Sequence, residues 1–208
     1  SLVHGRPVLV IDDGSTDDSG ERARQAGATV VRLAVNGGKG GAIVVGLHEA
    51  KALGGQAIVV LDADGQHDPA EVPRLIDASL DPRALVLGVR RLSALGAPLL
   101  NRFANASAAW PISFFAGRAL SDALCGFRRY PIDATLRLAP ARGRYEWECA
   151  VILALGRTGT PVVQTPVGAR YGPERFSFYR PGVDTLLPIR TVLGVGLLGR
   201  GASRFWAR

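Results

Sequence analysis

Two aspartates separated by a single residue, Asp62 and Asp64, directly follow the apolar run 57–61. In an extended backbone, residues two apart point to the same side, so these carboxylates would face one place. Two aligned carboxylates beside a phosphate suit a hard divalent cation, and Gln66 and His67 follow within reach. The chain has no Cys/His cluster, so Mg²⁺ or Mn²⁺ fits better than zinc, with Asp62 and Asp64 as the expected ligands. An ordinary solvated turn is the alternative for such a pair.

A second acidic strand end and a glycine-rich loop offer contacts for a nucleotide. Asp12 and Asp13 end the apolar run 8–11, where carboxylates can accept hydrogen bonds from a base or a ribose. Capping of the next helix is an alternative use of this segment and is compatible with nucleotide binding. Lys39 lies in Asn36-Gly-Gly-Lys-Gly-Gly41, which combines backbone donors, a helix start and a point charge for phosphate. The loop does not match the Walker pattern, which disfavours an NTPase.

These residues follow the strands in a succession of strand-turn-helix units. Three such units in a row predict a mostly parallel sheet with helices on both faces, and therefore a single α/β domain. The last strand is predicted at a sheet edge, because Pro166 lacks a backbone donor. Residues 94–119 mix large apolar side chains with arginines and suit an interface. The expected strands are 8–11, 29–33, 57–61, 85–89 and 162–167. One helix is expected to begin near Asp18, and a second to span 42–51.

Composition narrows the class of partner. The net charge of +7 and the pI near 10.2 indicate an anionic partner. The arginines are spread along the chain beside Gly and Pro turns, which disfavours nucleic acid and leaves phosphorylated substrates or acidic lipid. Cys125 and Cys149 make no disulfide framework and are expected to be small buried side chains, which fits a cytoplasmic protein.

The C-terminal stretch is apolar but interrupted by charge. Thr185 to Gly199 contains only one charged residue, Arg190, and arginines and aromatics follow it. No stretch of the sequence reaches the ~18 uninterrupted apolar residues that a spanning helix requires. Residues 183–208 are therefore predicted to be an amphipathic, membrane-associated segment, with a helix packed on the sheet as the alternative. The start of the chain has no signal-peptide pattern. The expected location is cytoplasmic, peripheral at the inner face of the membrane.

Four motifs occur in a set order along the chain: Val10-Ile-Asp-Asp-Gly-Ser-Thr-Asp17, Asn36-Gly-Gly-Lys-Gly-Gly41, Leu61-Asp-Ala-Asp-Gly-Gln-His-Asp-Pro69 and Cys125-Gly-Phe-Arg128. In this order and spacing they resemble family 2 glycosyltransferases, in particular the dolichyl/polyprenyl-phosphate mannose synthase type. The resemblance covers residues 8–167 and implies a GT-A (Rossmann-like) fold. It also implies an inverting enzyme that moves a hexose from a nucleotide-diphosphate sugar to a membrane acceptor, polyprenyl (dolichyl-type) phosphate above all, with Mg²⁺ or Mn²⁺.

The resemblance assigns roles to the matched positions. Asp12 and Asp13 would hold the nucleoside, while the Asp62, Asp64 and Gln66 group would surround the metal and the diphosphate. Arg90 would contact a phosphate, Asp122 would be an acidic residue on the acceptor side, and these two with Asp64 form the predicted catalytic set. A surface or structural role is the alternative for three of the arginines named here, Arg90, Arg102 and Arg128. The remaining donor-binding residues are expected to be Lys39, Arg102, Arg128 and Arg170, the last at the start of a flexible basic loop, 170–177.

Two acidic residues, Asp122 and Glu146, each have more than one possible role. A phosphate acceptor needs no strong base, because its second pKa of about 6 leaves it largely ionised at neutral pH. A hydroxyl acceptor would need a base, for which Asp122 is the candidate. In Tyr145-Glu-Trp-Glu148, Glu146 is favoured as a functional acid. Alternatively, both glutamates are carboxylates at the start of a helix, where the helix dipole favours negative charge.

The sequence departs from the family pattern at both ends. Family members begin with one more strand and helix before the 8–11 strand, and many carry transmembrane hairpins after the catalytic domain. The expected division is a GT-A domain over 1–182 and the membrane-associated segment over 183–208. Two other classes stay open: a non-catalytic module that binds a nucleotide sugar or a lipid phosphate, and a nucleotidyltransferase.

Overall fold

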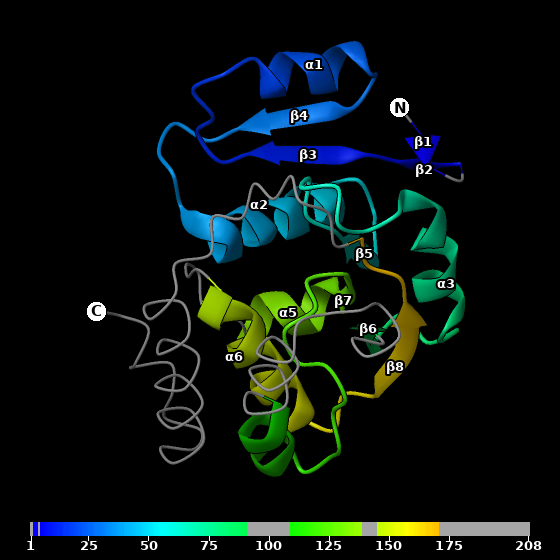
Figure 1. Cartoon of the computed structure of the whole chain (residues 1–208). Helices are drawn as coiled ribbons and strands as arrows, with labels where there is room; N and C mark the ends of the chain where they lie inside the picture. The colour runs from blue at the N-terminus through cyan, green and yellow to red at the C-terminus, as the bar shows by residue number, and fades with distance from the viewer. Residues whose placement is uncertain (1, 4, 91–108, 139–144, 171–208) are drawn as a thin grey trace.

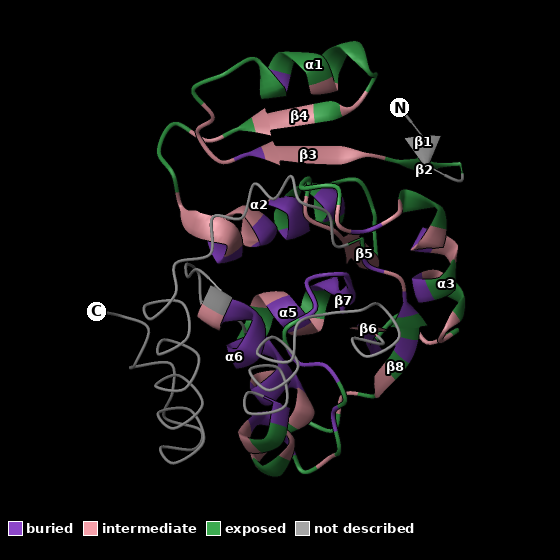
Figure 2. Ribbon diagram, viewed as in Figure 1, coloured by how far each residue is buried: buried purple, intermediate pink, exposed green. Residues whose placement is uncertain are grey.

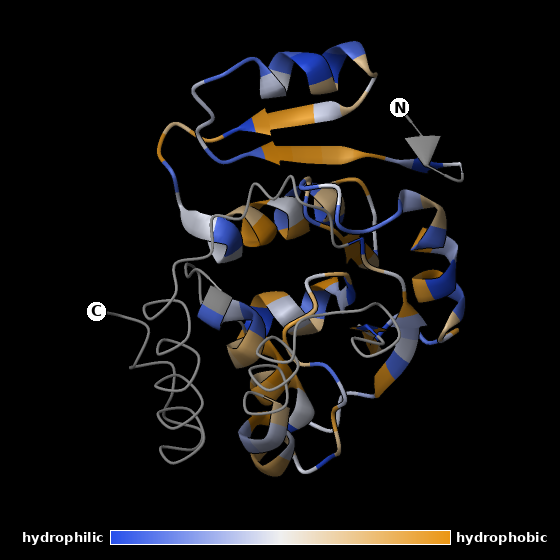
Figure 3. Cartoon of the chain, viewed as in Figure 1, coloured by the Kyte–Doolittle hydropathy of each residue, from blue (hydrophilic) through white to orange (hydrophobic). Residues whose placement is uncertain are grey.

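The computed structural model describes residues 2–3, 5–90, 109–138 and 145–170. At one end of the molecule, β3 (Leu9–Asp12) and β4 (Thr29–Arg32) pair in parallel. They are joined by α1 (Ser19–Gln25), and Figure 1 shows the three elements stacked together beyond α2. Both strands consist largely of hydrophobic residues, whereas α1 is mostly hydrophilic, as Figure 3 shows. The strands are mostly half-buried, and α1 faces water. A short antiparallel pair, β1 (Leu2–Val3) and β2 (Arg6–Pro7), precedes this unit.

The main sheet has four strands in the order β5-β7-β6-β8. β6 (Leu85–Arg90) and β8 (Val162–Val167) pair in parallel, whereas β7 (Arg128–Pro131) runs antiparallel to β6 and to β5 (Ala57–Val60). Three of the four strands therefore point the same way, as expected, although the inserted β7 makes two of the three pairings antiparallel. The predicted strands 8–11 and 29–33 form a parallel pair of their own outside this sheet. β8 lies at the sheet edge, as the proline at its fifth position indicated.

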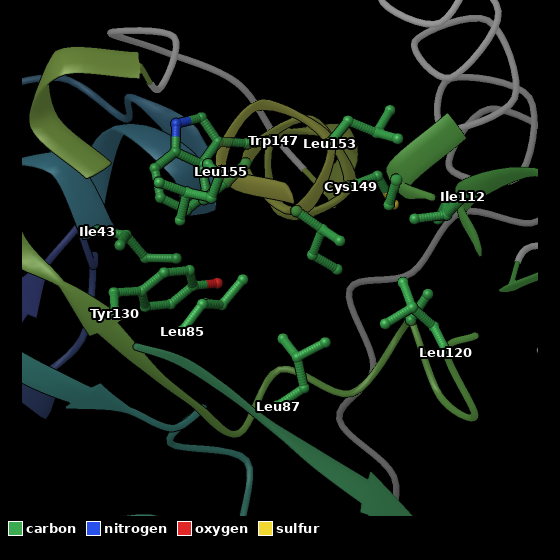
Figure 4. Close-up of a cluster of buried hydrophobic side chains, with 14 of the residues drawn as sticks. Ile43, Leu85, Leu87, Ile112, Leu120, Tyr130, Trp147, Cys149, Leu153 and Leu155 are labelled. Carbon is green, nitrogen blue, oxygen red and sulfur yellow. The ribbon is translucent and has the colours of Figure 1, made fainter. Parts of the chain in front are cut away.

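Helices cover both faces of this sheet, as predicted. On one face, α2 (Gly38–Ala52), α5 (Ile132–Leu138), α6 (Tyr145–Gly156) and the helical residues 109–116 contribute to the larger core cluster. Figure 4 shows side chains of α6, among them Trp147, Leu153 and Leu155, facing sheet residues such as Tyr130 and Leu85.

The opposite face holds a smaller cluster. It is built on α3 (Val72–Asp77), which follows the short 3-10 turn η1 (Pro69–Glu71). Strand β5 shows the alternation that such a two-sided sheet requires: Ile58 packs against the larger cluster and Val59 against the smaller one. Both cysteines are buried and unpaired, in agreement with the sequence expectation.

A glycine contact sets how closely α2 approaches α6. A Cβ at Gly40 would collide with the ring of Trp147, so only glycine permits this spacing of the two helices. Figure 2 shows that both helices are largely buried or half-buried, whereas α1 is mostly exposed. The close approach brings Lys39 in the first turn of α2 next to Glu148 in the first turn of α6.

Some expectations fall on residues that the structure does not describe. Arg102, most of the predicted interface stretch 94–119 and the predicted membrane-associated segment 183–208 lie outside the described residues. Within the described ranges, none of the helices combines the length and the apolar character needed to cross a bilayer.

Candidate active site

Three motifs that are distant in the sequence meet at the carboxyl end of β5. The ammonium of Lys39 donates to Asp62 Oδ2 at 2.8 Å and lies 3.1 Å from Glu148 Oε2. Gly126 closes this cluster from the loop before β7, because a Cβ there would lie 2.6 Å from Lys39 Nζ and 2.7 Å from Asp62 Oδ2. The glycine-rich loop, the Asp-x-Asp segment and the Cys-Gly-Phe-Arg motif thus share one point, to which α6 adds Glu148.

The charge on Lys39 is secured by its two carboxylate partners. Burial alone would lower the pKa of Lys39, but the negative charges of Glu148 and Asp62 outweigh that effect and raise the pKa above its ordinary value. The ammonium therefore stays charged at neutral pH. The Lys39 side chain is 18% exposed and that of Glu148 only 6%, so solvent screens this contact far less than a surface ion pair.

The Asp-x-Asp loop is fixed to the end of β8. Asp64 is exposed, and its Oδ1 accepts a hydrogen bond from the backbone N–H of Gln66 at 3.0 Å. The carbonyl of Gln66 accepts from the backbone N–H of Arg170 at 2.8 Å, and the Arg170 guanidinium donates to Asp68 at 3.0 Å. Arg170 is thus beside the predicted metal ligands. The role of the Gln66 side chain as a ligand stays a prediction.

His67 is a packing residue of this loop. It is buried against Phe127, with ring centroids 5.1 Å apart, and its Nδ1 lies 3.3 Å from the carbonyl oxygen of Gly168. Burial lowers the pKa of His67, which keeps the imidazole neutral at neutral pH. A neutral, enclosed imidazole suits holding the loop in place.

The donor set at the end of β5 fits a divalent metal. In the described part of the chain, no three His, Cys, Asp or Glu side chains gather closely enough to hold a metal on their own. Asp62 and Asp64 instead offer two accessible carboxylates, and the side chain of Asp62 is 37% exposed. Mg²⁺ is typically bound through one or two carboxylates, with waters and substrate phosphates as its other ligands. The ammonium already bound at Asp62 shows that this carboxylate attracts a cation.

Arg90 and Asp122 form a second polar pair at the end of β6. Asp122 Oδ2 accepts from Arg90 Nε at 2.7 Å, and Oδ1 accepts from a terminal nitrogen of the same guanidinium at 3.0 Å. The backbone N–H groups of Arg90 and Leu124 add two more hydrogen bonds to this carboxylate. The Asp122 side chain is 0% exposed and that of Arg90 is 15% exposed. This placement favours a carboxylate that orients Arg90 over one that removes a proton.

Asp12 and Asp13 accept hydrogen bonds from the backbone of the turns that follow β3 and β4. Asp12 is buried, and its Oδ1 accepts from the backbone N–H of Ser15 at 2.8 Å. Hydrogen bonding to Ser15, first through its side chain and then through its backbone N–H, lowers the pKa of Asp12. Asp13 Oδ1 accepts from the backbone N–H of Gly37 at 2.6 Å, which ties the end of β3 to the start of α2. Their role in holding a nucleoside stays a prediction. A hollow beside them is lined by Gly14, Ser15, Thr16, Arg32, Leu33 and Ala34.

The structure corrects the donor-binding role expected for Arg128. This side chain is 1% exposed, and its guanidinium donates to the backbone carbonyls of Cys125, Ala123 and Glu148 at 2.6, 2.7 and 2.9 Å. A guanidinium spent on three buried carbonyls has no surface for a ligand. The structural alternative is therefore favoured, with Arg128 stabilising the loop that carries Gly126.

Two members of the cluster were not among the residues predicted to act. Glu148, rather than Glu146, contacts Lys39, and Gly126 contributes only its lack of a side chain. The sequence held a partial indication, because Glu148 belongs to the first turn of α6, next to Trp147 and ahead of a mostly apolar run that must pack inward.

Comparison with known proteins identifies the family. Residues 7–131, more than half of the chain, match the model of glycosyl transferase family 2. Undecaprenyl-phosphate mannosyltransferase from Micrococcus luteus is 30% identical over an alignment covering 77% of this chain and 70% of that protein. Undecaprenyl-phosphate 4-deoxy-4-formamido-L-arabinose transferase from Pseudomonas savastanoi is 28% identical, and the match covers 85% of this chain but only 52% of that longer protein.

Solved structures agree with this family. Glucosyl-3-phosphoglycerate synthase from Mycobacterium tuberculosis, in complex with Mn²⁺, UDP and glucosyl-3-phosphoglycerate, superposes with a TM-score of 0.65 at 26% identity. The superposition covers 90% of this chain and 67% of the synthase. The four motifs, the α/β architecture and these likenesses lead to one conclusion: the chain belongs to glycosyl transferase family 2 and has the GT-A fold of that family's enzymes.

Proposed function

We propose that this chain transfers a hexose from a nucleotide-diphosphate sugar to a polyprenyl phosphate, with inversion at the anomeric carbon and with a divalent metal, Mg²⁺ or Mn²⁺. The observation that carries the proposal is the meeting of Lys39, Asp62 and Gly126 at the end of β5. In open α/β sheets, ligands bind outside the carboxyl ends of the strands, which is where this cluster lies. The relatives that act on undecaprenyl phosphate support the choice of acceptor.

The donor side is assigned to the end of β5. Asp62 and Asp64 would hold the metal, which when bound supplies positive charge that stabilises the diphosphate leaving group. Lys39 adds a positive charge at the same place, from the first turn of α2. The positive end of the α2 dipole lies at this turn and favours an anion.

The acceptor side is assigned to Arg90. Its guanidinium is oriented by the bidentate contact with Asp122, and it would bind the acceptor phosphate. An oxygen of that phosphate would attack the anomeric carbon as the bond to the diphosphate breaks, and the nucleoside diphosphate leaves with the electron pair. Because this nucleophile is already ionised, the enclosed Asp122 is not required as a base.

Contact with the membrane is also proposed. The chain carries a net charge of +7, which favours an anionic lipid surface. In the helical residues 109–116, Trp110 and Phe114 are 73% and 70% exposed and stack on each other with centroids 6.1 Å apart. Exposed aromatic pairs of this kind suit the interfacial region of a bilayer. We place the protein at the cytoplasmic face of the membrane, as a peripheral contact.

A transfer assay tests the proposal. The purified chain is incubated with a panel of labelled nucleotide hexoses, undecaprenyl phosphate in detergent, and Mn²⁺, and label in the organic phase is counted. At least one donor should give lipid-linked label, and Asp64→Ala should lose at least 100-fold of that rate, as expected for a lost electrostatic stabiliser of the transition state. Nucleoside diphosphate binding with no transfer from any donor would contradict the proposal and favour a non-catalytic binding module.

A further inference from the structure

Lys39 occupies the carboxylate that the proposed metal would use. Its ammonium is shared between Asp62 of the metal pair and Glu148 of α6, at 2.8 and 3.1 Å. An ammonium at Asp62 Oδ2 and a divalent ion bound by the same carboxylate would be close neighbours of like charge, which repel strongly where solvent is scarce. Lys39 in this position is therefore a competitor for the metal.

Glu148 lies where it can keep the Lys39 ammonium when the contact with Asp62 is lost. Its side chain is 6% exposed, and its Oε1 accepts no hydrogen bond within the described part of the chain. Arg128 Nε lies 4.0 Å from that oxygen, too far for a hydrogen bond, and its guanidinium is used by backbone carbonyls. Glu148 thus has capacity for a fuller contact with Lys39. A buried carboxylate with an unsatisfied oxygen is costly unless such a partner exists.

We infer that Lys39 is an internal competitor for Asp62, and that Glu148 is a positioning residue which holds Lys39 when the metal takes Asp62. Gly126 leaves room for both side chains, because a Cβ there would lie 2.6 Å from Lys39 Nζ and 2.7 Å from Asp62 Oδ2. The inference rests on the proposed metal site and adds the exchange of partners. It explains why a buried acidic residue on α6, remote from the Asp-x-Asp segment in sequence, lies against the lysine of the glycine-rich loop.

The test is the affinity for Mn²⁺ alone, with no nucleotide or sugar present. Free Mn²⁺ is measured by electron paramagnetic resonance during titration of the full chain. Lys39→Met should bind Mn²⁺ about tenfold more tightly, and Glu148→Gln about tenfold more weakly, which is the size expected for residues coupled through direct contact. The loss caused by Glu148→Gln should shrink to a small fraction in the Lys39→Met background, because no lysine remains to be held.

The controls separate this inference from a general charge effect. Lys51→Met removes a lysine from the same helix, where it pairs with the exposed Asp133 at 2.8 Å, and should leave Mn²⁺ affinity unchanged. If Glu148 acted only as a nearby negative charge, Glu148→Gln would weaken binding equally with and without Lys39, and the inference would be overturned. An unchanged or weaker affinity in Lys39→Met would overturn it as well.

Folding and the parent proposal are checked in the same series. Should Lys39→Met fail to fold, the double variant Lys39→Met/Glu148→Gln removes both charges, and it must bind Mn²⁺ more tightly than the natural chain for the inference to stand. Asp64→Ala should abolish binding in every background. If the natural chain binds no Mn²⁺ through Asp64, the metal site itself fails. If the natural chain binds Mn²⁺ through Asp64 but Lys39→Met and Glu148→Gln do not change the Mn²⁺ affinity as expected, only the present inference fails.

Discussion

At the scale of single residues, buried charges divide into those that orient another charged side chain and those that hold the backbone. Asp122 belongs to the first kind, because both of its oxygens orient Arg90. Arg128 belongs to the second, because its guanidinium satisfies three carbonyls. Sequence patterns do not separate the two kinds, since each is a charged residue within or beside a motif.

Asp122→Asn should act on the acceptor and not on the donor. The neutral amide cannot form the bidentate ionic contact, so Arg90 loses its fixed orientation. We expect the KM for polyprenyl phosphate to rise by about 10-fold to 100-fold, because a lost charge-assisted hydrogen bond costs roughly 1.5–3 kcal/mol. The affinity for the nucleoside diphosphate should not change. Steady-state kinetics with each substrate varied measures this split.

The matched control for that variant is Asp133→Asn, because Asp133 is an exposed aspartate paired with Lys51. It should leave both KM values unchanged. A loss of several orders of magnitude in kcat with both KM values preserved would instead mean that Asp122 removes a proton from the acceptor.

Arg128→Met should cost stability. The change leaves three buried carbonyls without donors and removes the cation beside Glu148, so we expect a loss of about 3–5 kcal/mol in the free energy of unfolding. Denaturant unfolding followed by circular dichroism measures it. Arg83→Met, whose side chain is 84% exposed, serves as the control and should change stability by no more than about 1 kcal/mol. Normal stability with lost nucleotide binding would restore the donor-binding role that the sequence suggested for Arg128.

At the scale of elements, the contact between α2 and α6 determines the geometry of the cluster. Lys39 and Glu148 belong to the first turns of these two helices, and Gly40 is the residue that lets the helices come this close. The separation of the charges is therefore a consequence of helix packing.

Two neighbouring glycines of α2 give a matched test of this packing. Gly40→Ala should destabilise the fold by about 1–3 kcal/mol, because the new methyl group overlaps Trp147. Gly41→Ala adds its Cβ where nothing lies within 4 Å, and should be neutral or stabilising by up to about 1 kcal/mol through helix propensity. Thermal unfolding of both variants gives the comparison, and equal melting temperatures would show that the helices do not require glycine at position 40.

Most elements could be predicted from the sequence because they are apolar runs that end in polar turns. The strands at 8–11, 29–33, 57–61, 85–89 and 162–167 all appear in the structure with bounds shifted by at most one residue. Strand β7 was not predicted, because Arg128–Pro131 reads Arg-Arg-Tyr-Pro and its arginines become buried only through tertiary contacts. Helix α2 starts at Gly38, four residues before the predicted start, since glycines gave no helical pattern.

The site could be predicted in its motifs and only partly in its contacts. The sequence pointed to Asp62 and Lys39 separately, each from its local pattern. That they touch, and that Glu148 and Gly126 join them, depends on how two helices pack and on a reversed strand. Local patterns carry no information on such long-range contacts, and this is why Arg128 was assigned to the ligand and not to the loop.

At the scale of the whole molecule, the start of α2 connects the parallel pair β3-β4 with the four-stranded sheet. The carboxyl ends of β3 and β5 are joined through the start of α2, by Asp13 with Gly37 and by Lys39 with Asp62. The end of β6 carries Arg90 and its partner Asp122. A donor bound at the first place would meet an acceptor phosphate bound at the second, which is the relation that direct transfer requires.

The most direct test of the account is calorimetric binding of UDP and of GDP to the natural chain and to Asp64→Ala, each with and without Mn²⁺. We expect one nucleoside diphosphate to bind the natural chain at least tenfold more tightly when Mn²⁺ is present, because a shared ion adds contacts to both partners. Asp64→Ala should lose this gain and keep the natural melting temperature. An equal affinity with and without Mn²⁺, or a gain that survives in Asp64→Ala, would contradict the assignment of the metal to the end of β5.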